Sequence, residues 1–258
     1  MSLESKRKIR LDLSYDGTDF EGWQIQKQGR TVQGELVKVL ESFHPGQRIS
    51  LVGSGRTDSG VHASCQVAHF ETEGCSIPSE RFRQAINSKL PRDIRIHKSC
   101  EVDTDFHARY DAVMRVYRYY LIKPEYQKAH MTQYSTLCLL DLDIPILNNM
   151  AMALTGTQDF TSFAAAKDPN NNKVRTIRSA RFFKEGPYTV FRVAGNAFLW
   201  KMVRTMVGTL LQQYENSGSY NDIKGILEMK DRTLAGPSAK PHGLFLDKVI
   251  YGSEKALY

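Results

Sequence analysis

The 258-residue sequence predicts an α+β protein of two related units whose antiparallel sheets join side by side, with the helices on one face. Two observations support this prediction. Segments of alternating apolar residues interleave with segments of helical periodicity in both halves, and turn residues at 185–187 indicate a hairpin and hence antiparallel pairing. Because no Pro/Gly/Ser-rich linker separates the halves, we expect adjoining domains over 1–104 and 105–258.

The first half begins with a segment typical of a half-buried strand. Ile9, Leu11, Leu13 and Tyr15 alternate with polar residues, and turn residues follow at 16–19. Later segments repeat this change between strand and helix patterns. The pattern predicts strands over 65–70 and 93–102, and helices over 32–43 and 82–90.

The second half repeats the alternation of strands and helices. Pro145 is a favourable first residue for a helix through Leu154, and Asn196 is expected to cap a long apolar helix ending near Leu211. A further short helix is predicted over 222–229. The predicted strands of this half are 113–122, 176–183, 188–194 and 244–251.

Charge and cysteine usage narrow the class of protein. The formal net charge is +7, and the stretch from Lys167 to Arg204 contains nine basic and two acidic residues. An anionic partner is therefore plausible without being required. The four cysteines form no C-x-x-C pair and are expected to be reduced. Neither a signal peptide nor a membrane span is indicated, and we expect a cytoplasmic protein without metal or cofactor.

The most unusual segment is G-S-G-R-T-D-S-G-V-H at 53–62. Gly60 is followed by Val61 and not by the Lys-Ser/Thr of a phosphate-binding loop, and Asp58 occupies the position where a dinucleotide fingerprint needs glycine. Neither serine has the glycines of a nucleophile elbow. What remains is a carboxylate on a glycine-rich turn, near Arg56, which could act as a nucleophile or only cap a local turn.

Several segments together resemble the tRNA pseudouridine synthase A family. Its active-site motif has the form G-[AS]-G-R-T-D-x-G-V-H-A, which 53–63 matches. Further blocks agree in order and spacing over almost the whole chain. They are L-S-Y-D-G-T-D-F-E-G-W-Q-I-Q at 13–26, F-H-A-R-Y at 106–110, R-V-Y-R-Y at 115–119, G-T-Q-D-F-T-S-F at 156–163, N-A-F-L-W-K-M-V-R at 196–204 and G-L-F-L at 243–246.

The resemblance implies two ferredoxin-like units with the active site in a cleft between them, and a role for individual residues. Asp58 matches the nucleophile, Tyr117 the tyrosine that stacks on the target uracil, and Arg204 the arginine that pairs with the catalytic carboxylate. Other matching positions contact the tRNA in the family. They are Arg56, Phe106, His107, Ala108, Arg109, Tyr110, Lys167, Asp168, Pro169, Asn170 and Asn171.

The activity implied is conversion of uridine to pseudouridine at positions 38, 39 and 40 of the tRNA anticodon stem-loop, by a homodimer that uses no cofactor. Attack of Asp58 on the ribose, attack on uracil, and a route through a glycal all remain open. Two other interpretations also remain, and a third is disfavoured. The chain could be a non-catalytic RNA-binding module or a synthase of different uridine specificity, whereas a carbohydrate hydrolase would need a second carboxylate that the motifs do not supply.

Overall fold

A computed structural model describes residues 6–252 of the chain. The described residues form two compact units. Residues 6–113 and 246–252 make the first unit, and Met114–Phe245 make the second. Residues 1–5, on which the expectation of no signal peptide partly rests, lie outside the described range.

The first unit is built on an antiparallel core of three strands. β1 pairs in antiparallel register with both β3 and β4, and the side chains of Ile9, Leu11 and Leu13 on β1 are completely buried. The short β2 pairs with β3 in antiparallel orientation. The strand order is β4 (Ile94–Val102), β1 (Arg7–Tyr15), β3 (His62–Thr72) and β10 (Leu244–Tyr251), with β2 (Val52–Gly53) beside β3.

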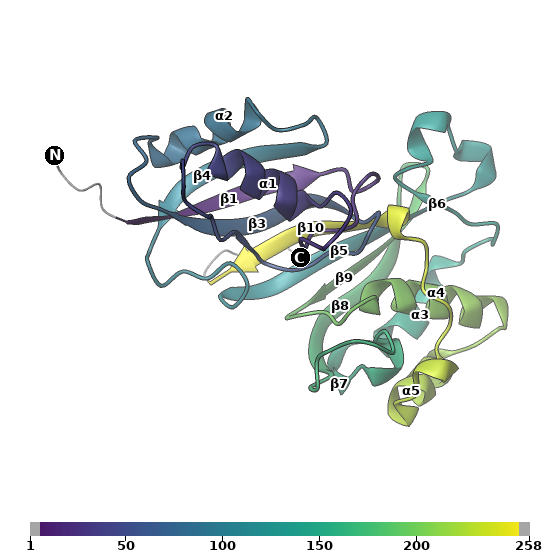
Figure 1. Ribbon diagram of the computed structural model, residues 1–258. Coiled ribbons are helices and arrows are strands. Elements are labelled where there is room, and N and C mark those ends of the chain that lie inside the picture. Colours follow the sequence, from purple (N-terminus) through teal and green to yellow (C-terminus); the bar gives the residue numbers. More distant parts are fainter. Residues whose placement is uncertain (1–5, 253–258) are drawn as a thin grey trace. The chain divides into compact units, whose positions relative to one another are not determined.

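Two helices cover one face of this sheet (Figure 1). α1 (Val32–Glu41) begins at Thr31, whose hydroxyl accepts a hydrogen bond from the Gly34 amide and so satisfies one of the amides left unpaired in the first turn. The apolar face of α1 is buried, as the helical spacing predicts. α2 (Phe82–Asn87) follows a single 3₁₀ turn, η1 (Ser79–Arg81), and packs on β4.

The second unit contains a mixed sheet. β8 and β9 form the predicted hairpin, in which Gly186 takes the positive φ that the tight turn requires. The strand order is β5 (Ala112–Ile122), β9 (Tyr188–Gly195), β8 (Val174–Glu185) and β7 (Gly156–Asp159), antiparallel throughout, with the short β6 (Thr136–Leu137) parallel to β5.

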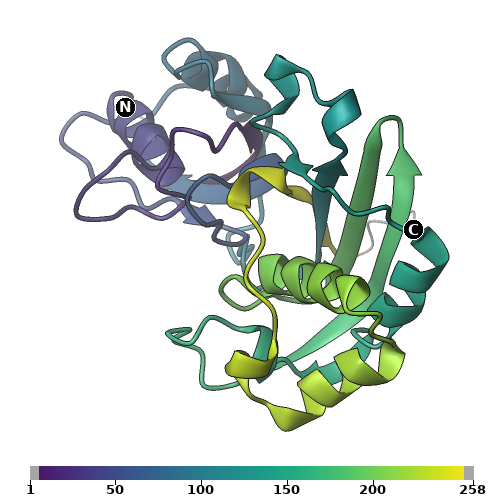
Figure 2. The same ribbon diagram turned by 90° about the vertical axis from the view of Figure 1, so that its right-hand side faces the viewer.

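Three helices pack together in this unit. α3 contacts β8 and both other helices, and α4 and α5 lie next to each other (Figure 2). Their bounds are α3 (Ile144–Met152), α4 (Met202–Glu215) and α5 (Tyr220–Met229). Short 3₁₀ turns complete the unit at η2 (Pro124–Tyr126), η3 (Ala129–Met131), η4 (Thr161–Phe163), η5 (Arg232–Leu234) and η6 (Pro241–Gly243).

The predicted α+β class with antiparallel pairing is confirmed, and one helix boundary is wrong. We expected Asn196 to cap the long helix, but α4 begins at Met202. The Asn196 side chain instead accepts hydrogen bonds from the amides of Thr176 and Ala197, and Lys201 has a left-handed backbone that interrupts the helical course. Among the described residues, no helix is both long enough and apolar enough to cross a membrane.

Candidate active site

The loop 53–62, which we call the Asp58 loop, connects β2 to β3 in the first unit. Its beginning is fixed by short contacts to β3. The Ser54 amide donates to the Val67 carbonyl at 2.7 Å, and the Ser54 hydroxyl donates to Gln66 Oε1 at 2.6 Å. The Gln66 amide group then donates to the Gly55 carbonyl at 3.0 Å. Because Gln66 is completely buried, these contacts hold the loop start rigidly.

A second segment, the turn 16–23 after β1, packs its backbone directly against the Asp58 loop. The Trp23 amide donates to the Thr57 carbonyl, and the Gly60 amide donates to the Phe20 carbonyl, both at 3.2 Å. Gly22 has a φ of +93°, and a Cβ placed on it would lie 2.5 Å from the Thr57 carbonyl oxygen. This approach therefore requires glycine at position 22.

Gly17 makes the same kind of contact at the other end of the loop. A Cβ on Gly17 would lie 2.0 Å from the Val61 carbonyl oxygen, which is far inside contact distance. Asp16 next to it accepts hydrogen bonds from the amide and hydroxyl of Thr18, so it serves as the turn residue that the sequence indicated. The turn 16–23 is thus a backbone support for the Asp58 loop.

Asp58 lies at the tip of this supported loop. Its main-chain carbonyl accepts from the Val61 amide at 3.1 Å and closes the turn, and its side chain is half-buried. The preceding Thr57 is buried, with its hydroxyl 2.8 Å from the Tyr15 hydroxyl of β1. Arg56 is exposed. A partly accessible carboxylate on a fixed backbone has the placement that a nucleophile needs.

His62, the last residue of the motif, is completely buried at the start of β3. Its Nδ1 accepts a hydrogen bond from the Gly17 amide at 3.0 Å and also lies 3.1 Å from an Asp16 carboxylate oxygen. A ring nitrogen that accepts from an amide carries no hydrogen, so we assign Nδ1 as the acceptor of the Gly17 amide. The imidazole thereby connects the supporting turn to the end of the Asp58 loop.

The F-H-A-R-Y segment at 106–110 also lies in the first unit and is anchored at Ala108. The Ala108 amide donates to His69 Nδ1 at 3.1 Å, and its carbonyl accepts from the Tyr251 hydroxyl at 2.6 Å. Burial, with the nearby charges of His107 and Lys8, lowers the pKa of His69 to about 4. His69 is therefore neutral at pH 7 and can serve as this acceptor.

Arg109 and Tyr110 of the same segment are exposed, whereas the Phe106 ring packs against Tyr251 and His69. Tyr110 is 75% exposed and stacks on the His107 ring with 4.2 Å between centroids, and the Arg109 guanidinium lies 5.9 Å from the Tyr110 ring centroid. An exposed tyrosine next to a cation can contact an RNA base and its phosphate. Of the predicted contact residues here, Ala108 is the one whose side chain is buried.

In the second unit, Arg115, Tyr117 and Tyr119 share one face of β5. The ring of Tyr117 is edge-on to Phe198 with 5.0 Å between centroids, and Arg115 donates to the Asn196 carbonyl at 2.7 Å. Tyr119 is completely buried; burial raises the pKa of its phenol to about 12, although a hydrogen bond with Thr136 and the charge of Arg204 act in the opposite direction.

Arg204 is held in α4 by a reciprocal contact with Ala239. Its Nε donates to the Ala239 carbonyl at 2.7 Å, and the Ala239 amide donates to the Arg204 carbonyl at 2.9 Å. The segment 235–239 can lie against α4 because Gly208 has no side chain: a Cβ there would be 1.7 Å from the Pro237 carbonyl oxygen. This support did not follow from the sequence, although the small residues A-G-P-S-A at 235–239 were a signal for it.

The segment 167–171 is the last of the predicted contact regions. Lys167, Pro169, Asn170 and Asn171 are exposed, but the Asp168 side chain has 0% exposure. Its Oδ1 accepts from Asn170 and Lys173 and its Oδ2 accepts from the Trp200 amide at 2.6 Å. The Asp168 carboxylate therefore organises the segment internally, and a role for it in binding RNA stays a prediction.

The predicted site residues fall into two groups. Arg56, Asp58 and Phe106–Tyr110 belong to the first unit, and Tyr117, Lys167–Asn171 and Arg204 belong to the second. Within residues 6–252, no group of three or more His, Cys, Asp or Glu side chains is placed to hold a metal ion. The supporting residues Gly17, Gly22 and His69 did not follow from the sequence, because each acts through a contact distant along the chain.

Comparison with known proteins identifies the family. A family model described as tRNA pseudouridine synthase matches residues 13–111 and 150–252. Proteins named tRNA pseudouridine synthase A are similar to it over nearly the whole chain. That of Treponema denticola is 46% identical over 253 residues, which cover 96% of this chain and 94% of the relative. That of Anoxybacillus flavithermus is 43% identical over 245 residues, which cover 95% of this chain and 99% of the relative. The protein of Geobacillus kaustophilus is 42% identical over 248 residues, 96% of both chains. The resemblance expected from the motifs is confirmed, and the chain belongs to the tRNA pseudouridine synthase family.

Proposed function

We propose that this protein is an isomerase that converts uridine to pseudouridine in tRNA, with Asp58 as the nucleophile. Family membership supports the reaction, and the observation that supports Asp58 is its position on a loop fixed from both sides by backbone contacts. In the reaction the bond between ribose C1′ and uracil N1 breaks and a bond between C1′ and C5 forms. The proton on C5 leaves and N1 gains one, so atoms and electrons balance without a co-reactant.

The other residues receive roles by their match to the family motifs. We assign Tyr117 to stacking on the target uracil and Arg204 to orienting the catalytic carboxylate. An aromatic ring in contact with the base offsets the cost of removing that base from its stack. Arg56, Arg109, Tyr110 and Lys167 supply cations and an aromatic surface for the RNA backbone and bases.

The specificity proposed is for uridines 38, 39 and 40 of the anticodon stem-loop. The homodimer and the cytoplasmic location remain predictions of the same kind. A map of pseudouridine positions in unmodified tRNA treated with the protein tests the specificity, because conversion elsewhere would assign a different uridine set to the same chemistry. Molecular mass in solution tests the dimer.

The central experiment measures release of tritium from C5 of uracil in an unmodified tRNA transcript. Asp58→Asn should lower release by at least about a thousandfold, because the nucleophile is lost while its shape is kept. Binding of tRNA, measured separately, should change by no more than about threefold. Retained activity in Asp58→Asn would rule out the nucleophile, and binding without release by the unaltered protein would favour a non-catalytic RNA-binding module.

A further inference from the structure

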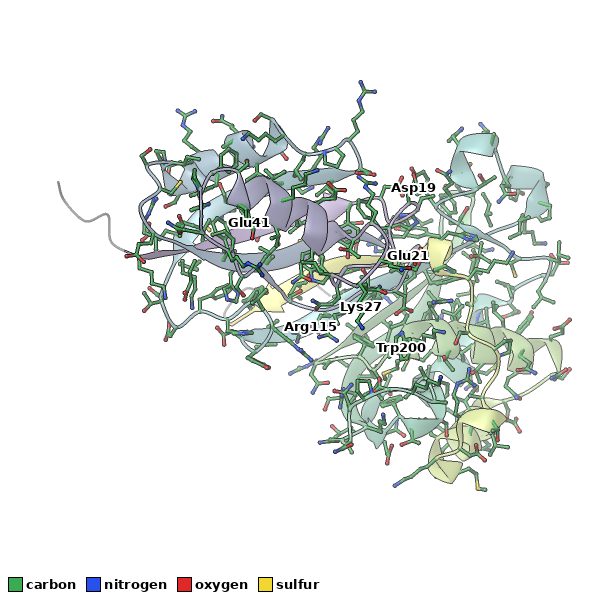
Figure 3. All side chains as sticks on the ribbon, viewed as in Figure 1. Asp19, Glu21, Lys27, Glu41, Arg115 and Trp200 are labelled. Atoms are coloured by element: carbon green, nitrogen blue, oxygen red, sulfur yellow. The ribbon has the colours of Figure 1, made fainter. Side chains whose placement is uncertain are left out.

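Trp200 is an exposed aromatic residue that no catalytic role requires. It lies in the second unit (Figure 3), immediately before α4. Its exposed fraction is 43%. The other tryptophan of the chain, Trp23, is 2% exposed and packs against Gly53. Exposing a large ring to water forgoes the free energy of burying it, so a rigidly held exposed tryptophan suggests a binding surface.

The backbone on both sides of Trp200 is fixed. Its amide donates to Asp168 Oδ2 at 2.6 Å, and its carbonyl accepts from the Ala165 amide at 2.9 Å. The next residue, Lys201, has φ 60° and ψ 5°, a left-handed conformation that costs a residue with a side chain free energy. The indole is therefore presented from a constrained backbone and not from a loose loop.

The charges around the ring favour a polyanion. Burial alone would raise the pKa of Asp168, but hydrogen bonds from the Trp200 and Asn170 amides and from Lys173 outweigh it and lower the pKa to about 2. The carboxylate is thus ionised, completely covered and paired with Lys173, whose Nζ is 3.0 Å away. The cations nearer the surface are Lys201, with Nζ 5.3 Å from the indole centroid, and the exposed Lys167.

We propose that Trp200 is a stacking platform for an unpaired RNA base, with Lys201 contacting an adjacent phosphate. A flat, rigid ring next to a cation fits a nucleotide, because every base has a face that can stack and every nucleotide carries a phosphate. This inference rests on the proposed function in that RNA is the ligand. It adds a base-binding site separate from the one assigned to Tyr117.

Intrinsic fluorescence can test the platform directly, since Trp200 is the exposed one of two tryptophans. Titration with an unmodified tRNA transcript should quench the unaltered protein, and Trp200→Phe should lose that quenching while binding within about threefold of normal. Trp200→Ala should weaken binding by about 5- to 100-fold, the effect of removing one base stack. Lys201→Gln should reduce the slope of log binding constant against log salt concentration by about one, which corresponds to one released ion.

Two controls make the result specific. Tyr126→Ala removes another exposed aromatic residue of the second unit, whose surroundings carry both acidic and basic side chains, and should leave binding unchanged. A fully paired RNA duplex should quench much less than single-stranded oligouridylate, because its bases are already stacked. Thermal unfolding of each variant verifies that it is folded.

The inference is overturned if quenching persists in Trp200→Phe, if duplex and single-stranded RNA quench equally, or if Trp200→Ala binds tRNA normally. These outcomes are distinct from a failure of the proposed function. Quenching by RNA without tritium release would refute the synthase activity and leave the platform in place. Tritium release with normal binding by Trp200→Ala would refute the platform alone.

Discussion

The Asp58 loop of the first unit and the segment 165–173 of the second each carry an aspartate in a polar turn, yet they are stabilised in different ways. Backbone contacts with the turn 16–23 support the Asp58 loop, and the Asp58 side chain is half-buried. In the other segment the Asp168 carboxylate is fully covered and accepts four hydrogen bonds. The difference suggests that Asp58 is placed to react, whereas Asp168 is a structural centre for neighbouring residues.

The largest expected effect comes from breaking the backbone support. Gly22→Ala would combine a positive φ with a Cβ 2.5 Å from the Thr57 carbonyl oxygen, and should lower the free energy of unfolding by about 4 kcal/mol together with most of the activity. Urea unfolding and tritium release measure the two effects. Gly55→Ala is the matched control, since a Cβ there meets nothing within 4 Å. Equal stability of the two variants would contradict backbone support.

The next effect tests the structural role of Asp168. Asp168→Ala removes the partner of Lys173 and of the Trp200 amide, and should lower the free energy of unfolding by about 3 kcal/mol. Asp168→Asn should cost less, because it keeps an acceptor of similar shape. Thermal unfolding of the two variants measures the difference. If Asp168→Ala unfolds like the unaltered protein but binds tRNA poorly, the carboxylate acts on the RNA. Asp168 would then be a functional residue like Asp58 and not a structural one.

A third prediction concerns His69, which supports the 106–110 segment as a neutral side chain. Its pKa is about 4 in the folded protein and about 6.5 in the unfolded chain, so the unfolded state binds the proton first as the pH falls. The free energy of unfolding should therefore fall by about 2.5 kcal/mol between pH 6.5 and pH 4 because of this group. His69→Gln should flatten that part of the pH profile, and His97→Gln, at an exposed position, should not.

The smallest effect is expected at Arg30, which stabilises the turn 16–23 through an ion pair and a contact with the Phe20 ring. Its guanidinium binds both oxygens of Asp93 at 2.6 and 3.0 Å and lies 4.1 Å from the Phe20 ring centroid. Because Arg30 is 34% exposed, solvent screens this pair, and Arg30→Lys should cost about 1 kcal/mol. Chemical unfolding measures the loss. A cost equal to that of Gly22→Ala would mean that charge supports the loop as strongly as the backbone does.

Much of the fold followed from local patterns in the sequence. The alternation at 9–15, the helical spacing at 32–43 and the turn residues at 185–187 each act over a few residues, and β1, α1 and the β8–β9 hairpin form where they indicate. The start of α4 did not follow. Phe198 and Leu199 continue the apolar pattern of the helix, but tertiary hydrogen bonds of Asn196 and Trp200 hold their segment outside it.

For the candidate site, the sequence predicted the functional residues better than it predicted the contacts that support them. The motif identified Asp58 because its residue types are unusual together, whereas the need for glycine at 17 and 22 depends on a loop about 40 residues away. For Asp168, the sequence predicted the wrong surroundings. Its neighbours suggested an exposed cationic turn, and only the fold shows that its carboxylate is covered.

The return of the chain to the first unit at Leu246 has a consequence for biosynthesis. β10 lies next to β3, and Tyr251 donates to the carbonyl of Ala108, so residues 246–251 complete a unit whose other strands are made earlier. During translation the part of the β3 edge that β10 covers stays unpaired until residues 246–251 have left the ribosome, although the short β2 already pairs with β3 at 68–69, and an unpaired edge invites association with other chains. Nascent chains that stop before residue 246 should therefore depend on chaperones more than the full-length protein does.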